Sequence, residues 1–184
     1  NCGASESFGK NPEYLRYSAA HSTVILQNTN ISEIREGTPH IKFPQAVVFR
    51  RDSNSEIETF EASHNGYLKK FNKIIKRKLI IYKNTDMVVG EDTFISYKDI
   101  NSRLIYHIRF HLSDGMTFNF TNNKKNIILK TKFNNIWIFK SDIELIVEDS
   151  IIVDNNITKP SKQIVIKGLL SNNKVIKKWS IEKI

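Results

Sequence analysis

The sequence predicts an all-β fold: a large antiparallel β-sandwich of about a dozen strands, with one short helix at most. Hydrophobic side chains recur with a period of two rather than 3.6, in segments rich in β-branched and aromatic residues. Clusters of Gly, Asn, Asp and Ser separate these segments. A chain of 184 residues, 40% of them hydrophobic, can bury one sizeable core. We therefore expect a single domain over residues 1–184.

The first half of the chain begins with the one helix candidate, NPEYLRYSAA (11–20). The segments that follow alternate between apolar and polar residues and read as strands. They are STVILQN (22–28), QAVVFRR (45–51), EIETFEAS (56–63), IKRKLIIY (75–82) and DMVVGED (86–92). Turn signals stand between them at REGTP (35–39), RDSNS (51–55) and KNTD (83–86).

The second half is predicted to contain strands only. They are RLIYHIRFHL (103–112), MTFNF (116–120), NIILKTKF (126–133), NIWIFKS (135–141), IELIVE (143–148), QIVIKG (163–168) and VIKKWSIEK (175–183). The turns expected between them are SDG (113–115), TNNKKN (121–126) and DNNITKPS (154–161).

The segment 103–112 has the clearest alternation. One face would carry Leu104, Tyr106, Ile108, Phe110 and Leu112, and the other Arg103, Ile105, His107, Arg109 and His111. An apolar face opposite a mostly polar one is typical of an antiparallel sheet that packs on one side.

The chain is basic, with 28 Lys+Arg against 19 Asp+Glu. Part of this excess is a general bias toward Ile, Asn and Lys, but one segment is more specific. Between Gly66 and Ile80 no acid occurs, and a strand there would present a cationic strip of Lys69, Lys70, Lys73, Lys76, Arg77 and Lys78. An acidic polysaccharide suits such a strip. Nucleic acid is disfavoured, because only Tyr67 and Phe71 are interleaved as stacking platforms.

Several classes of site are excluded by pattern. The single cysteine, Cys2, rules out a disulfide framework, and no apolar run is long enough for a spanning helix. A nucleophile elbow, a P-loop and a dinucleotide-binding glycine motif are absent. His107 and His111 would lie about 13 Å apart on one strand, too far to share a metal ion. We therefore expect no complete metal site within the chain.

Two clusters at strand entries carry candidate binding residues. LRYSAAHSTVIL (15–26) contains Arg16 and His21, and EASHNGYLKKF (61–71) contains His64, Asn65 and Tyr67. These residue types hold the hydroxyls and carboxylates of sugars. The alternative is that they are hydrogen-bonded structural residues.

The two clusters, and their order along the chain, resemble sequence segments of the heparinase II/III-like family. Residues 16–24 are similar to its R-x-(S/T)-A-A-H-(N/S)-T-V segment, and residues 61–67 to its E-A-S-H-D-G-Y segment. Residues 109–112 resemble its R-F-H-L strand, and QIVIKG and KWSI resemble its closing strands. The resemblance covers essentially the whole chain.

The resemblance implies the C-terminal β-sandwich domain of a polysaccharide lyase that acts on uronic-acid polymers. Such lyases cleave by β-elimination: the uronate carboxylate is neutralised, a base removes the C5 proton, and the O4 leaving group is protonated. The family's catalytic Tyr lies in a preceding (α/α) toroid, and a catalytic His lies just before the start of this sequence. The domain would then form one wall of the cleft, with Arg16, His21 and residues 64–67 near it, and would be inactive alone.

The resemblance also bears on metal binding. His21 matches a family histidine that holds a structural zinc ion together with another His and an Asp. Asn1 stands where that Asp is expected, and an amide is a poorer zinc ligand than a carboxylate. The resemblance thus implies a structural zinc in the longer protein, with this departure at one ligand.

Two other functions stay open at this point. If the domain is a non-catalytic module that binds acidic polysaccharide through residues 69–78, it should bind polyanions on its own in a salt-dependent way. If it is one wall of a cleft, it should bind them little or not at all on its own. If the domain binds nucleic acid, its affinity for DNA or RNA should fall with salt concentration at a rate set by several phosphate contacts. The identity of the polysaccharide is not encoded in these motifs, nor is the compartment, periplasm or cytoplasm of a bacterium.

Overall fold

A computed structural model gives the fold, and it describes residues 2–3, 13–34, 43–98, 103–154 and 157–184. These residues contain twelve strands, each of which overlaps one of the predicted segments. The strands are β1 (Val24–Leu26), β2 (Ala46–Ser53), β3 (Ile57–His64), β4 (Lys73–Tyr82), β5 (Met87–Ser96), β6 (Leu104–His111), β7 (Thr117–Phe120), β8 (Asn126–Lys130), β9 (Ile136–Ser141), β10 (Leu145–Asp154), β11 (Ile157–Leu170) and β12 (Lys174–Lys183).

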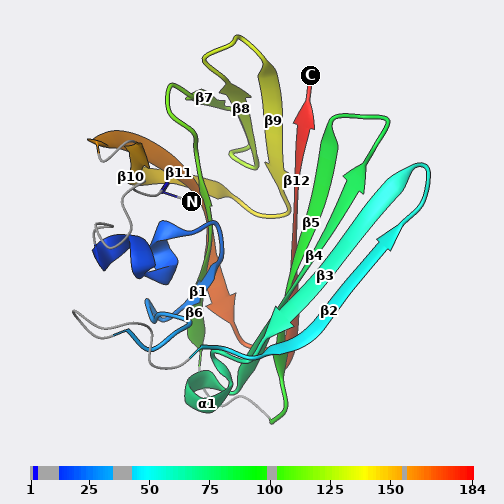
Figure 1. Cartoon of the computed structure of the whole chain (residues 1–184), viewed down its shortest axis with the longest axis vertical. Coiled ribbons are helices and arrows are strands. Elements are labelled where there is room, and N and C mark those ends of the chain that lie inside the picture. Colours follow the sequence, from blue (N-terminus) through cyan, green and yellow to red (C-terminus); the bar gives the residue numbers. More distant parts are fainter. Residues whose placement is uncertain (1, 4–12, 35–42, 99–102, 155–156) are drawn as a thin grey trace.

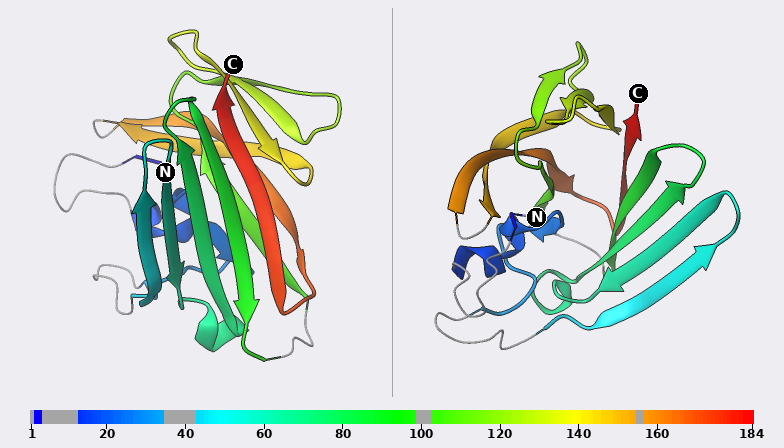
Figure 2. Two further views of the ribbon diagram at one scale, coloured as in Figure 1. Left: turned by 90° about the vertical axis from the view of Figure 1, so that its right-hand side faces the viewer. Right: turned by 45° about the horizontal axis from the view of Figure 1, so that its top comes forward.

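The strands form two antiparallel sheets, which confirms the predicted β-sandwich. One sheet has four strands in the order β1-β6-β11-β10, and the other has eight in the order β2-β3-β4-β5-β12-β9-β8-β7. Figure 2 shows β2–β5 and β12 as one broad face with the four-stranded sheet behind it. Among the described residues, no helix is long and apolar enough to cross a membrane.

The core lies where the inner faces of the two sheets meet. Tyr106 and Ile108 from the four-stranded sheet are buried against Phe94, Trp179 and their neighbours from the larger one. The ring of Tyr106 lies 4.9 Å from that of Phe94, centroid to centroid. This is the apolar face that the alternation in 103–112 predicts.

The opposite face of β6 is less exposed than that alternation indicates. Ile105 is exposed, but His107 is buried, and Arg109 pairs with Glu148 of β10 at 2.7 Å. His111 is hydrogen-bonded at both ring nitrogens, through Nδ1 to the hydroxyl of Ser150 in β10 and through Nε2 to the carbonyl of Ala19 in the N-terminal segment. This outer face of the small sheet is therefore partly covered rather than fully solvated.

The helical elements differ from the prediction in place. The segment 11–20 forms two 3-10 turns, η1 (Glu13–Arg16) and η2 (Ser18–Ala20), instead of an α-helix. The short α-helix, α1 (Leu68–Phe71), lies between β3 and β4. Asn72 ends it in the left-handed conformation (φ 53°), and its N–H donates to the carbonyl of Leu68.

The predicted turn at 154–161 is shorter than expected. Strand β10 continues to Asp154 and β11 already begins at Ile157, so Pro160 lies within a strand opposite Ile151. β6 pairs with β11 only from Gln163 onward, so Pro160 stands where β11 has one neighbouring strand. Proline is tolerated at such a position.

An ion pair between Arg77 and Asp92 lies at the centre of the large sheet. Arg77 donates from Nε and Nη2 to the two carboxylate oxygens of Asp92 (2.7 and 3.0 Å), and Trp179 Nε1 donates to the same carboxylate (2.9 Å). The guanidinium also lies over the Phe110 and Trp179 rings. We call this group the central ion pair; it joins β4, β5 and β12 to the facing sheet.

Gly90 makes room for this arrangement. It pairs with Trp179 across β5 and β12, and the indole ring lies directly over its Cα. A Cβ at this position would overlap the ring atoms of Trp179. The absence of a side chain at Gly90 thus lets the indole reach Asp92.

Candidate functional site

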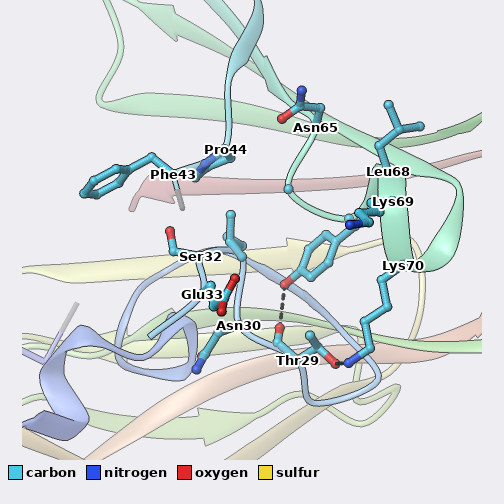
Figure 3. A pocket seen from close by; sticks show the side chains of 13 residues that line it. Thr29, Asn30, Ser32, Glu33, Phe43, Pro44, Asn65, Leu68, Lys69 and Lys70 are labelled. Atoms are coloured by element: carbon cyan, nitrogen blue, oxygen red, sulfur yellow. Dashed lines mark hydrogen bonds between the residues drawn. The ribbon is translucent and has the colours of Figure 1, made fainter. Parts of the chain in front are cut away.

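A groove of about 940 Å³ lies at the end of β3 from which α1 follows (Figure 3). We call it the lysine groove. It lies between the loop after β1, the segment before β2 and the turn into α1. Its lining residues are Thr29, Asn30, Ile31, Ser32, Glu33, Phe43, Pro44, Asn65, Gly66, Tyr67, Leu68, Lys69 and Lys70.

Tyr67 joins two walls of this groove. Its side chain is fully buried, and its hydroxyl donates to the carbonyl of Thr29 at 2.9 Å, the bond drawn in Figure 3. Burial raises the pKa of Tyr67 well above the usual value for a phenol. The group therefore stays protonated at neutral pH and holds the loop after β1 against α1.

Gly66 and Asn65 fix the other walls. A Cβ on Gly66 would lie 2.9 Å from the carbonyl oxygen of Ile31, so only glycine lets the two backbones approach so closely. The side-chain Oδ1 of Asn65 accepts from the backbone N–H of Gln45 at 2.9 Å, and the backbone N–H of Asn65 donates to the Gln45 carbonyl. Asn65 thus ties the segment carrying Phe43 to the end of β3.

The exposed side chains of the groove have a different chemistry. Phe43 is 69% exposed, and the ammonium groups of Lys69 and Lys70 have no carboxylate partner among the described residues. Lys70 Nζ donates only to the hydroxyl of Thr29, at 3.4 Å. With Glu33 as the one acid in the lining, the groove has a net positive charge and one accessible aromatic ring.

The predicted site residues fall into two places. Asn65 and Tyr67 line the groove, and His64 is adjacent: its ring lies 5.9 Å from that of Tyr67 and its Nδ1 accepts from the Gly66 N–H. Burial lowers the pKa of His64, so the ring is neutral. Arg16 and His21 do not line this groove. Arg16 ends η1, and His21 is exposed just after η2.

The prediction of a continuous cationic strip over residues 66–80 is wrong. Residues 68–71 are helical, and the alternation of β4 then sends its basic side chains to opposite faces. Lys73 is fully buried, its Nζ donating to the carbonyl of Asn172, while Arg77 turns inward to Asp92 and Lys76 pairs with Glu61. Burial lowers the pKa of Lys73. Only Lys69 and Lys70 remain as free charges beside the groove.

Phe43 is a groove residue that the sequence pattern did not single out. It stands in IKFP, just before a proline and outside any alternating segment, so its sequence signal is an isolated aromatic in a loop. Its place in the wall depends on the hydrogen bonds between Gln45 and Asn65. Those bonds are tertiary and leave no trace in local periodicity.

The described residues do not form a zinc site around His21. Within them, no three His, Cys, Asp or Glu side chains gather as a set of metal ligands. Asn1, which the resemblance predicts to stand at the family's Asp position, lies outside the described residues. The structural zinc of the longer protein stays a prediction.

Comparison with known sequences gives a match over nearly the entire chain. The family model described as "Heparinase II/III-like, C-terminal" matches residues 1–180. Among curated protein sequences, no match was found.

The fold is also shared with solved lyase structures. The heparan sulfate lyase HepC of Pedobacter heparinus superposes with a TM-score of 0.70 at 13% identity, covering 89% of this chain and 24% of the lyase. The heparinase III-BT4657 gene product superposes with a TM-score of 0.71 at 12% identity, covering 93% and 25%. The chain thus spans about a quarter of the length of these proteins.

Proposed function

Because the chain belongs to the heparinase II/III-like, C-terminal family, we propose that it is the β-sandwich domain of a polysaccharide lyase. In this role it forms one wall of the active-site cleft, opposite a preceding (α/α) toroid. The substrate is a uronic-acid polymer, cleaved by β-elimination. The observation that carries the proposal is the lysine groove, whose lining includes Asn65 and Tyr67 from the segment 61–67 that resembles the family.

The chemistry of the groove suits an acidic saccharide. The ammonium groups of Lys69 and Lys70 can bind carboxylates or sulfates as point charges, and no carboxylate within the described residues neutralises them. The exposed ring of Phe43 offers a surface for the apolar face of a sugar ring. Two charges and one ring supply only part of a binding site, so we expect the chain alone to bind weakly.

Neither Tyr67 nor His64 is arranged to act as the base of the elimination. Tyr67 is buried with its hydroxyl bonded to a carbonyl, and its raised pKa makes it a poor base. His64 is neutral but its Nδ1 is already occupied by the Gly66 N–H. In the proposal, the base and acid of the β-elimination come from outside this chain, and the chain orients the substrate.

Cleavage is the decisive test, because weak binding alone does not separate a lyase from a non-catalytic binding module. The full-length gene product is incubated with heparan sulfate, heparin, alginate and hyaluronan, and the ultraviolet absorbance of the unsaturated uronate product is followed. We expect a rise with at least one polymer, and a raised KM in Lys69→Ala/Lys70→Ala. No rise with any uronate polymer, together with tight binding by the 184-residue chain, would favour the binding module instead.

His21 is tested in the same assay. If it lies at the cleft, His21→Ala lowers kcat or raises KM while the protein stays folded. Unchanged kinetics would assign His21 a structural role and leave the lyase proposal intact.

A further inference from the structure

A second hollow, of about 350 Å³, lies on the other side of η2. We call it the tyrosine groove. It forms where the N-terminal 3-10 turns lie beside the four-stranded sheet, near β10 and β11 (Figure 1). The residues that matter for its chemistry are Tyr14, Tyr17, His111, Ser150 and Gln163. It has no lining residue in common with the lysine groove.

Two tyrosine rings line this groove and remain accessible. Tyr14 is 39% exposed and Tyr17 is 41% exposed. The hydroxyl of Tyr14 is hydrogen-bonded to Thr158 Oγ1 at 3.2 Å, and the N–H of Tyr17 donates to the Tyr14 carbonyl. The rings are thus held on a folded turn, and tyrosine offers a large contact area for little conformational entropy.

Gln163 adds a polar group to the wall. Its side chain is 8% exposed, and its Nε2 donates to the Asp149 carbonyl at 3.2 Å. This bond fixes the amide so that Oε1 is a buried acceptor, for which the described residues provide no donor. A buried acceptor without a partner is costly unless a hydroxyl or N–H reaches it.

The remaining side chains that line the groove bring no unpaired charge. His111 Nε2 lies 3.0 Å from the Ala19 carbonyl and must donate to it, so Nδ1 is the acceptor for the Ser150 hydroxyl at 2.9 Å. Burial lowers the pKa of His111 to about 4, so the imidazole is neutral at pH 7. The carboxylate of Asp149 is paired with Lys162.

We propose that the tyrosine groove binds an uncharged sugar unit, whose apolar face packs on the tyrosine rings and whose hydroxyl donates to Gln163 Oε1. Aromatic rings, a fixed neutral acceptor and an Asp149 carboxylate that is already paired favour a hydroxyl-rich ligand over an ionic one. This site is distinct from the lysine groove, and its occupancy does not depend on the lyase proposal.

The test is an NMR titration of the ¹⁵N-labelled 184-residue chain with uncharged tetrasaccharides: chitotetraose, cellotetraose and a β-galactotetraose. We expect saturable shifts of the amides of Ala19, Ser150 and Gln163 with at least one of them, unchanged by added salt. Tyr17→Ala is expected to weaken this binding by about five-fold, whereas Tyr17→Phe keeps the ring and the affinity.

Tyr82→Ala is the matched control. Tyr82 has the same exposure as Tyr14 but lies at the end of β4 and does not line the groove, so its removal leaves the affinity unchanged. The absence of saturable shifts at the groove with all three sugars would overturn the proposal. Equal affinities of the wild type and Tyr17→Ala, with both spectra well dispersed, would overturn it as well.

Discussion

The basic residues between Gly66 and Ile80 contribute to two regions that treat charge in opposite ways. In the central ion pair, Arg77 is inside the sandwich and both carboxylate oxygens of Asp92 accept from it. In the lysine groove, Lys69 and Lys70 extend from α1 with no carboxylate partner among the described residues. One segment of sequence thus supplies both Arg77, whose charge is neutralised between strands, and two lysines that carry unpaired charges beside the lysine groove.

This difference shows that local charge density does not define a binding surface. The alternation of β4 and the facing residues of β5 and β12 decide which cations are neutralised. A cation that turns inward stabilises the fold only while its partner is present. A cation on α1 costs the fold little and remains available to a ligand.

The largest effect is expected from breaking the central ion pair. Asp92→Ala leaves the Arg77 guanidinium without its counter-charge and the Trp179 N–H without an acceptor. We expect a loss of about 3–5 kcal/mol in the free energy of unfolding, measured by urea denaturation. Asp149→Ala, which breaks an exposed pair with Lys162, is the control and is expected to unfold like the wild type. Equal losses in the two variants would contradict the distinction between inward and exposed charges.

A smaller loss is expected from a methyl group at Gly90. Gly90→Ala forces the Trp179 ring away from β5 and lengthens its bond to Asp92. The expected cost is about 2 kcal/mol, with a changed near-ultraviolet circular dichroism spectrum from the displaced indole. Wild-type stability with an unchanged spectrum would show that the indole does not depend on the space above Gly90.

His111 is a third case beside the paired Arg77 and the unpaired lysines, because it has no counter-charge and its ring is neutral. Its pKa, about 4 because of burial, lies below the usual value near 6.5. Between these pH values only the unfolded chain binds the proton, so stability falls as pH falls from 6.5 to 4. We expect this group to account for about 2 kcal/mol after allowing for partial exposure of the ring.

The check is the free energy of unfolding at pH 7, 5.5 and 4.5. His111→Asn removes the titrating group, so the loss of stability on acidification becomes smaller in the variant. An identical pH dependence in both proteins would mean that His111 titrates normally in the folded chain.

The smallest effect on stability is expected in the lysine groove. Lys69→Ala/Lys70→Ala removes two exposed charges and places good helix formers in α1, so the free energy of unfolding changes by less than about 0.5 kcal/mol. Thermal and urea denaturation check this value. A loss as large as that of Asp92→Ala would mean that these lysines hold the fold.

The sequence was a good guide to the strands and a poor one to side-chain direction. Period-two alternation located all twelve strands, including β7, which has little of its surface buried. The helix α1 was missed because four residues cannot show a helical period. The early start of β11 was missed because Asn-rich and Pro-containing stretches also mark turns.

Asn65 and Tyr67, which were singled out from the sequence, line the lysine groove, but the sequence does not show what their side chains contact. The structure places the Tyr67 hydroxyl in a buried hydrogen bond and Asn65 against Gln45. The inward turn of Arg77 follows from Asp92 and Trp179, which lie 15 and 102 positions further along the chain. Local pattern cannot supply such partners.

The most direct measurement is an NMR titration of the 184-residue chain with a heparan sulfate hexasaccharide at low salt. We predict weak, saturable shifts at the amides of Ser32, Asn65, Lys69 and Lys70 that diminish as salt is added. Lys69→Ala/Lys70→Ala should abolish them, whereas Lys174→Ala/Lys178→Ala, which removes two exposed charges from β12, should leave them intact. Shifts that survive in the groove variant, or that map to β12 instead, would contradict the assignment of acidic-sugar binding to the lysine groove.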